Sequence, residues 1–266
     1  MNNNINYIKK KFAILVVSCD KYSDLWDPFF ELFFKFWPDC PFNIYLLSNY
    51  KITNYQKVKT INIGEDISWS DNLYKGLNLL KEDYVFLLLE DLFFIDFVNT
   101  DKILNLFKLA LSINVCYLRF RPDPKPDKKY NELIGVVSKG TVYRATSAVC
   151  IWEKEILSKL LKTNETAWDF EIIGSVRSDE YDNFFSTWEK YFYLTNGCIK
   201  GKWQRGVIKK LNSLGIQIDL NNREIMTLKE TITFFFRSLY FRLFLGMFPA
   251  KYRKRFRDFI INLKKK

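Results

Sequence analysis

The sequence predicts an α/β protein built on a doubly wound, mostly parallel β-sheet. Continuous apolar runs, which are typical of strands buried on both faces, recur at 12–18, 42–48, 59–63, 84–89 and 115–120. Segments with helical signals separate these runs, at 25–37, 70–81 and 101–113. Such alternation favours right-handed crossovers, and sheets of this kind bind ligands at the carboxyl ends of their strands.

The boundaries of these elements follow from prolines and capping residues. Pro28 suits the first turn of the helix at 25–37, and Pro38 lies just past its end. Ser70 is the expected N-cap of the helix that runs through residue 81. After Phe120 the segment RPDPKPDKK holds three of the seven prolines and predicts a mobile loop. Shorter strands are expected at 133–137, 141–144 and 147–152, and helices at 153–161 and 168–175.

Composition excludes several kinds of chemistry. The 266 residues include no histidine, which excludes Ser-His-Asp and Cys-His nucleophiles, histidine-ligated zinc and a histidine base. Five cysteines without a CxxC pair predict reduced thiols in a cytosolic protein. The apolar run near the start of the chain is too short for a signal-peptide core, so we expect no export.

The formal net charge of +11 is concentrated at one end of the chain. Residues 229–266 hold eleven basic residues against two acidic ones, which leaves a nearly neutral +2 for residues 1–228. We therefore expect a catalytic domain at 1–228 and a basic, aromatic-rich helical tail at 229–266. Arg237 and Arg242 interrupt the first tail helix, at 231–248, so it is not expected to span a bilayer.

A second tail helix is expected after Pro249. Its apolar stripe has helical spacing and is flanked by basic residues; the stripe consists of Tyr252, Phe256, Phe259, Ile260 and Leu263. This pattern predicts a peripheral, membrane-associating tail on an anionic surface. One alternative is a helix that packs on the body and leaves its basic face in solvent. The other is nucleic-acid binding, but the nearly neutral body disfavours it, so we expect no nucleic-acid partner. The sequence does not indicate an oligomeric state.

Two adjacent acids give the strongest functional signal. Glu90 and Asp91 interrupt the apolar run YVFLLLEDLFF at the end of a strand that is otherwise fully buried. Buried charge needs a partner, and Mg²⁺ or Mn²⁺ takes oxygen ligands from one or two carboxylates and a substrate phosphate. We therefore expect a metal site here rather than a surface turn with two solvated acids.

Two further polar clusters could bind a nucleotide. Ser18 and Asp20 follow the first strand and could hold a base and a ribose, or Asp20 could simply cap the next helix. Trp69, Ser70 and Asp71 open a helix, where Trp69 offers a stacking face and Asp71 lies near the helix N-terminus. Capping alone also explains Ser70 and Asp71.

The segments VVSCDKYSDLW, SWSDNL, LLLEDLFF, YRATSAVCIW and AWDFEIIGS resemble GT-A glycosyltransferases. They look most like the bacterial enzymes that build lipopolysaccharide, lipooligosaccharide or capsule glycans, and the resemblance covers about residues 12–215. It implies a GT-A-like fold, a nucleotide-sugar donor, and a lipid-linked or lipopolysaccharide glycan acceptor at the inner face of the cell membrane. It places Ser18, Asp20 and 69–71 near the nucleotide, with Glu90 and Asp91 at a Mn²⁺ or Mg²⁺ ion and the diphosphate. The sequence departs from the family's Asp-x-Asp pattern by having Glu-Asp-Leu.

The same resemblance implies an inverting reaction with a carboxylate as general base. Asp169 and Glu171 are the candidates, and Glu171 is preferred because Asp169 could be a helix N-cap. Lys202, in NGCIKGKWQR, would neutralise the leaving phosphate, unless this segment is only a basic surface turn. Arg119 and Arg121 are rival ligands for a phosphate or an anionic acceptor.

Two other functions stay open. A nucleotidyltransferase could share this sheet, but VVSCDKYSD lacks the Gly-rich basic loop that usually holds a triphosphate. A non-catalytic scaffold at the membrane surface could have kept the fold and lost the activity.

Overall fold

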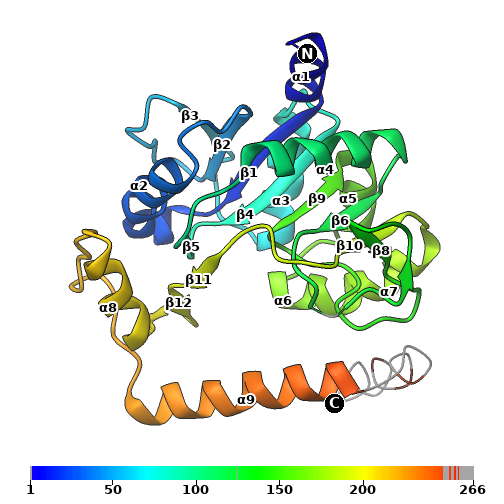
Figure 1. The fold of residues 1–266 in the computed structure, drawn as a ribbon. Helices are drawn as coiled ribbons and strands as arrows, with labels where there is room; N and C mark the ends of the chain where they lie inside the picture. Colours follow the sequence, from blue (N-terminus) through cyan, green and yellow to red (C-terminus); the bar gives the residue numbers. More distant parts are fainter. Residues whose placement is uncertain (1, 124, 248–251, 253–254, 256, 258–266) are drawn as a thin grey trace.

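The structure, a computed structural model, describes residues 2–123, 125–247, 252, 255 and 257. Nine strands of the described chain form one sheet, in the order β3-β2-β1-β4-β9-β6-β10-β8-β7 (Figure 1). The strands are β1 (Phe12–Val17), β2 (Asn43–Ser48), β3 (Val58–Asn62), β4 (Tyr84–Leu89), β6 (Tyr117–Arg119), β7 (Lys128–Lys129), β8 (Ile134–Val136), β9 (Cys150–Glu153) and β10 (Phe184–Thr187).

The predicted parallel sheet is confirmed in the half that contains β3, β2, β1 and β4. Beyond β4 the sheet is mixed, because β9 is antiparallel to both β4 and β6. The chain between β6 and β9 reverses through loops and the short strands β7 and β8, without the helical crossover that a parallel strand needs. The strand expected at 141–144 is wrong, since these residues form turns.

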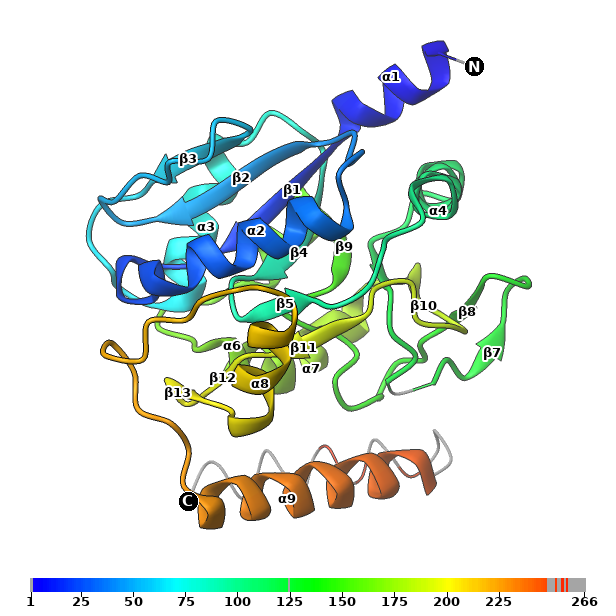
Figure 2. The ribbon, with the colours of Figure 1, turned by 60° about the vertical axis from the view of Figure 1, so that its left-hand side comes forward.

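Helices cover both faces of this sheet. The helices are α1 (Asn2–Lys11), α2 (Trp26–Phe36), α3 (Trp69–Leu79), α4 (Thr100–Ser112), α5 (Lys154–Leu160), α6 (Ala167–Asp169), α7 (Ser175–Arg177), α8 (Arg205–Ser213) and α9 (Leu228–Met247). α2 and α4 pack on one face and α3 and α5 on the other, as Figure 2 also shows. The helices predicted at 25–37 and 101–113 are confirmed to within a residue, whereas α1 was not predicted.

Strand alternation divides the core into two apolar layers. On β1, Phe12, Ile14 and Val16 face α2 and α4, whereas Ala13 and Leu15 face α3 and α5. All six residues of β1 are buried, as the unbroken apolar run predicts. The polar residues after the strand ends are therefore the first that water or a ligand can reach.

Shorter elements adjoin the end of β4. β5 (Leu92–Phe94) pairs with β11 (Leu194–Asn196), and β12 (Cys198–Ile199) pairs with β13 (Lys202–Trp203). The β12–β13 turn has positive φ at both central residues, Lys200 (51°) and Gly201 (78°), so the segment expected as a flexible loop forms a tight hairpin.

The tail begins with α9, which lies below the body and at the end opposite α1 in Figures 1 and 2. This helix corresponds to the first predicted tail helix. Within the described residues, no helix combines the length and the apolar character that a membrane crossing requires. The second predicted tail helix lies outside the described residues, apart from Tyr252, Arg255 and Arg257.

Candidate functional site

The carboxyl ends of the parallel strands bring the predicted site residues to one edge of the sheet. β1, β2, β3 and β4 run in the same direction, and β6 runs parallel to them across β9. Residues that follow these strands, together with those that precede antiparallel β9, therefore share this edge. The segments gathered here are 18–20, 49–51, 64–71, 90–91, 120–121 and 147–149.

Glu90 and Asp91 form a buried acidic pair at the end of β4. Glu90 is only 7% exposed, and Asp91 is half-buried. Burial raises the pKa of Glu90 well above its usual range, and the charge of Asp91 adds to this shift. Burial also raises the pKa of Asp91. Two adjacent buried carboxylates cannot both ionise at low cost, so this pair needs a proton or a cation.

Arg223 is a nearby cation, and sequence reasoning missed it. Its guanidinium donates to the two carboxylate oxygens of Asp24 at 2.6 and 2.8 Å and to the Lys21 carbonyl at 2.8 Å. It also lies over the ring of Tyr22, 4.3 Å from the centroid. Its charge opposes the raised pKa values of Glu90 and Asp91. Asp24 and Arg223 are 199 positions apart, and nothing in the local sequence indicates that they meet.

The acidic pair has the donor atoms that a hard divalent cation prefers, but it can supply only part of a coordination shell. In the part of the chain that the structure describes, no three His, Cys, Asp or Glu side chains converge where they could hold a metal unaided. Mg²⁺ and Mn²⁺ sites often consist of one or two carboxylates completed by substrate phosphates and water. Glu90 and Asp91 fit a metal of this kind, which would bind together with a diphosphate.

Ser18 and Asp20 lie at this edge, and their polar atoms bond to the protein itself. The Ser18 hydroxyl accepts the indole N–H of Trp26 at 2.8 Å. The Asp20 carboxylate accepts the backbone N–H groups of Asn49, Tyr50 and Lys51. Asp20 therefore shapes the loop after β2 and does not cap α2. A role for Ser18 and Asp20 in nucleotide binding stays a prediction.

Trp69 is the first residue of α3, and its ring packs against Phe170 with 5.3 Å between ring centroids. Its indole N–H is buried and has no hydrogen-bond partner among the described residues. This contact joins the start of α3 to the helical segment that carries Glu171. Base stacking on Trp69 stays a prediction.

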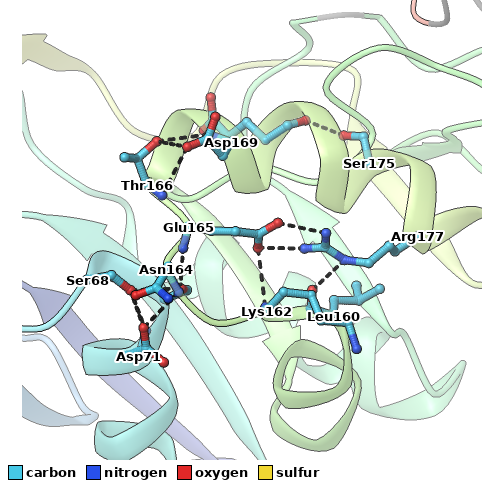
Figure 3. Close-up of polar contacts among 12 residues, drawn as sticks. Ser68, Asp71, Leu160, Lys162, Asn164, Glu165, Thr166, Asp169, Ser175 and Arg177 are labelled. Atoms are coloured by element: carbon cyan, nitrogen blue, oxygen red, sulfur yellow. Dashed lines mark hydrogen bonds and ion pairs between the residues drawn. The ribbon is translucent and has the colours of Figure 1, made fainter. Parts of the chain in front are cut away.

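The N-terminus of α3 holds a second loop in place (Figure 3). Ser68 and not Ser70 is the N-cap, because the Ser68 hydroxyl accepts the Asp71 N–H. This frees the Ser70 hydroxyl to accept the Glu165 N–H at 3.0 Å, and Asp71 accepts the Asn164 N–H at 2.9 Å. Ser70 and Asp71 thus connect the N-terminus of α3 to residues 164–165.

Glu171 is the preferred candidate for the general base, and this role stays a prediction. It belongs to the π-helical segment η2 (Phe170–Gly174) and is half-buried. Its Oε1 accepts the N–H of Ser147 at 2.9 Å and the Ser147 hydroxyl at 2.7 Å, whereas its Oε2 has no partner among the described residues. Burial raises the pKa of Glu171, and the charges of Arg119 and Arg121 partly oppose this shift.

Asp169, the alternative base, is engaged in helix capping. It is not the N-cap itself, as the sequence suggested, but the third residue of a capping box whose N-cap is Thr166. Its carboxylate accepts the Thr166 hydroxyl at 2.6 Å and the Thr166 N–H at 3.2 Å. Of the two candidates, Glu171 is therefore the one that takes no part in helix capping.

A buried ion pair fixes the loop that leads into Glu171 (Figure 3). Arg177 donates to both carboxylate oxygens of Glu165 at 2.7 Å, and its Nε donates to the Leu160 carbonyl at 2.8 Å. The two side chains are 19% and 11% exposed. This bidentate pair, another feature that the sequence did not reveal, orients the segment between α5 and η2.

Lys202 lies at the junction of the body and the tail. Its ammonium pairs with Glu224 at 2.9 Å and with Glu230, in the first turn of α9, at 3.1 Å. These two hydrogen-bonded partners raise the pKa of Lys202. A role for Lys202 at the leaving phosphate stays a prediction.

A polar cavity of about 410 Å³ lies at the opposite edge of the sheet, between α1 and the start of β4. Within its lining Lys11 pairs with Asp83, and Glu155 pairs with Lys159, which lies outside the lining. Glu90 and Asp91, at the carboxyl edge of the sheet, form no ion pair among the described residues, so this edge is the better candidate for the functional site.

The comparisons with known proteins give structural neighbours only. No protein-family model matches the sequence, and no curated protein matches it. The structure of S. aureus TarS 1–349 matches with a TM-score of 0.49 and 11% identity, over 70% of this chain and 60% of that chain. Its complex with UDP-GlcNAc matches with a TM-score of 0.48 and 11% identity, over 69% and 57% of the two chains.

A third neighbour is more distant. Bifunctional IspDF from Campylobacter jejuni matches with a TM-score of 0.35 and 12% identity, over 63% of this chain and 47% of that chain. The chain thus spans less than two thirds of the length of these neighbours. The sequence identities and the TM-scores are too low to support an assignment of fold or function. Such an assignment must come from this chain's own strand order and site geometry.

The Glu165–Arg177 pair allows a direct test of how the loop is held. We expect Arg177→Met to lower the free energy of unfolding by about 3 kcal/mol, because it leaves a buried carboxylate without its partner. The double variant Glu165→Gln/Arg177→Met should recover part of this loss. Urea denaturation measures the free energy of unfolding of the two variants and of the wild-type protein.

The exposed pair Glu155–Lys159 provides the control, since its side chains are 72% and 52% exposed. Lys159→Met should leave the urea midpoint unchanged. If Arg177→Met changed the midpoint as little as Lys159→Met, the loop would not depend on the buried pair.

Proposed function

We propose that this chain is a glycosyltransferase that moves a sugar from a nucleotide-sugar donor to a hydroxyl of a glycan acceptor. One observation carries the proposal. The half-buried carboxylate of Glu171 shares a sheet edge with the acidic pair Glu90 and Asp91; Ser147 holds one of its oxygens, and the other has no partner in the described part of the chain. Transfer of a sugar from a diphosphate leaving group requires a general base and a stabilising positive charge. Glu171 could be the base, and the acidic pair could bind a cation at the same edge.

The donor would bind along the ends of β1 and β4. Its diphosphate would lie near Asp91 and Glu90, which would hold Mn²⁺ or Mg²⁺; the bound metal would offset the charge of the leaving group. The nucleoside would lie toward Ser18, Asp20 and the start of α3. Arg223 supplies a fixed positive charge beside the acidic pair whether or not a metal is present.

Transfer needs one proton to be removed from the acceptor. The acceptor hydroxyl would donate to Glu171 Oε2, and its oxygen would bond to the anomeric carbon as the bond from that carbon to the diphosphate breaks. The proton goes to Glu171, and the electron pair of the broken bond leaves with the nucleoside diphosphate. Attack opposite the leaving group inverts the anomeric centre, and the proposal is therefore an inverting reaction.

Replacing the proposed base tests this function. We expect Glu171→Gln to lower kcat for transfer about 100-fold or more, since general-base catalysis contributes at least that much, while binding of UDP is retained. UDP-GlcNAc and UDP, present in the S. aureus TarS complexes, are the first donor and product to assay. Rates come from the release of UDP, and affinities from calorimetry.

The pH dependence gives an independent check. Glu171 must be deprotonated to act, so the transfer rate should fall as the pH drops through its raised pKa, above the usual range of a glutamate near 4.3. This acidic limb should disappear in Glu171→Gln. A Glu171→Gln enzyme with the wild-type kcat and the same acidic limb would contradict the assignment, and Asp169→Asn is the next variant to assay.

The metal proposal has its own test. We expect Asp91→Asn to weaken the dependence of turnover on Mn²⁺ or Mg²⁺ and to lower kcat/KM for the donor by about tenfold or more, because one of two charged ligands is lost. Asp96→Asn, at an exposed position beyond β5, is the control. Unchanged donor turnover and metal dependence in Asp91→Asn would remove the metal site from this edge.

We further propose that the acceptor is a lipid-linked or lipopolysaccharide-type glycan, as in capsule or lipopolysaccharide synthesis, met at the cytoplasmic face of the membrane. The support comes from α9, where exposed apolar side chains repeat with helical spacing: Leu228, Ile232, Phe235, Phe236 and Leu239. The net charge of +9 in residues 229–266 would attract an anionic leaflet. An apolar stripe within a basic tail suits a helix that lies in the membrane interface.

Vesicle binding tests this localisation. The full chain should sediment with phosphatidylglycerol vesicles more than with phosphatidylcholine vesicles, and salt should weaken the binding. Phe235→Ala/Phe236→Ala should lower the partition coefficient about tenfold or more, because two large apolar groups no longer enter the interface. Phe97→Ala, an exposed aromatic of the body, is the control. An unaltered membrane-bound fraction after deletion of residues 229–266 would contradict the proposal.

A further inference from the structure

Two arginines at the end of β6 point to the kind of acceptor that the proposed site takes. Side chains alternate along β6 (Tyr117–Arg119), so Tyr117 and Arg119 project from one face of the sheet and Leu118 from the other. The Phe120 N–H still donates to the Val149 carbonyl at 3.1 Å, so Arg121 directly follows the last residue that bonds to the segment 147–149. Tyr117 belongs to the apolar layer that contains Phe170, whereas Leu118 and Phe120 belong to the opposite layer. The Arg119 side chain is therefore on the face that carries Phe170 and its neighbour Glu171, and Arg121 follows two residues later at the same edge of the sheet.

The two arginines differ in how they are held. Arg119 is 2% exposed, and its Nη1 donates to the Tyr143 carbonyl at 2.9 Å. Arg121 is half-buried, and its guanidinium has no hydrogen-bond or ion-pair partner among the described residues. The Ser186 hydroxyl donates to the backbone carbonyl of Arg121 at 3.0 Å and not to its side chain. A partly desolvated guanidinium without a partner is costly, and its planar fork matches a carboxylate or a phosphate.

Glu171 and Arg121 adjoin the same segment, 147–149, without forming an ion pair with each other. Ser147 holds Oε1 of Glu171, and the Phe120 N–H, one residue before Arg121, donates to the Val149 carbonyl at 3.1 Å. The charge of Arg121 also opposes the raised pKa of Glu171. Among the described residues, Oε2 of Glu171 has no partner. A ligand that offers a hydroxyl to Oε2 could therefore present an anionic group to Arg121.

We infer that Arg121 binds an anionic group of the acceptor, a carboxylate or a phosphate, and so selects acidic sugars or sugar phosphates over neutral ones. This inference rests on the proposed function, because it extends the site in which Glu171 takes the proton of the acceptor hydroxyl.

Binding of matched sugars to the full-length protein tests the inference. The probes are glucose, glucuronate and glucose 6-phosphate, measured by ligand-detected NMR titration in the presence of UDP. Wild-type protein should bind at least one of the two acidic sugars about tenfold more tightly than glucose, as a charge-assisted bidentate contact allows. Comparison of the two acidic sugars tells a carboxylate site from a phosphate site.

The variants assign the preference to one residue. Arg121→Gln should bring the ratio of acidic to neutral affinity to about one, and Lys128→Gln, a loss of charge on the same loop, should keep the wild-type ratio. If circular dichroism shows that Arg121→Gln does not fold, salt provides the second measurement. Raising NaCl from about 50 to about 500 mM should reduce the preference of the wild-type protein without changing its affinity for glucose.

A wild-type protein that binds both acidic sugars no better than glucose overturns the inference, as does a preference that survives in folded Arg121→Gln. Binding of UDP to the same samples reports separately on the proposed function. If UDP binds and the acidic preference is absent, only the inference fails. If UDP does not bind and the preference depends on Arg121, the anion site stands and the proposed donor site fails.

Discussion

The burial of two neighbouring carboxylates at the end of β4 is the constraint on which the rest of the site depends. Glu90 and Asp91 follow a strand that lies between β1 and β9, so the chain leaves a fully apolar environment directly at two acids. Such a pair is costly unless positive charge or a proton reaches it. The pair would therefore be stabilised by a cation bound at this edge of the sheet.

The C-terminal part of the body is arranged around this pair. The Gly197 N–H donates to the Asp91 carbonyl at 2.7 Å, and a Cβ at Gly197 would lie 2.1 Å from Cε2 of Phe93, so this close approach requires glycine. Farther along, the Asp24–Arg223 pair ties the segment after α8 to the loop after β1. Residues from the N-terminal and the C-terminal parts of the body, Asp24, Gly197 and Arg223, thus lie near the two acids that follow β4. On the other side, Ser147 and the Glu165–Arg177 pair fix Glu171.

Local patterns in the sequence predict the elements that carry this site. The apolar runs of β1 and β4 and the acids after β4 are visible as a pattern because burial on both faces removes polar residues from a strand. The antiparallel course of β9 is not visible, since its run CIWE would suit a strand of either direction. Pairings across long sequence separations, such as Asp24 with Arg223, have no local signal at all. The sequence alone gives only a weak preference for Glu171 over Asp169. The capping box that includes Asp169 depends on Thr166 and on the residue at which α6 begins, which the sequence does not determine.

Hydrogen–deuterium exchange of the full-length protein, with and without UDP, tests most directly whether the carboxyl edge of the sheet is the donor site. Bound UDP should slow the exchange of backbone N–H groups at 18–25, 64–72 and 89–95, where the strand ends and the N-terminus of α3 meet. Protection at the opposite edge instead, around Lys11, Asp83 and Glu153 in the 410 Å³ cavity, would contradict this placement. Unchanged exchange at saturating UDP would contradict it equally.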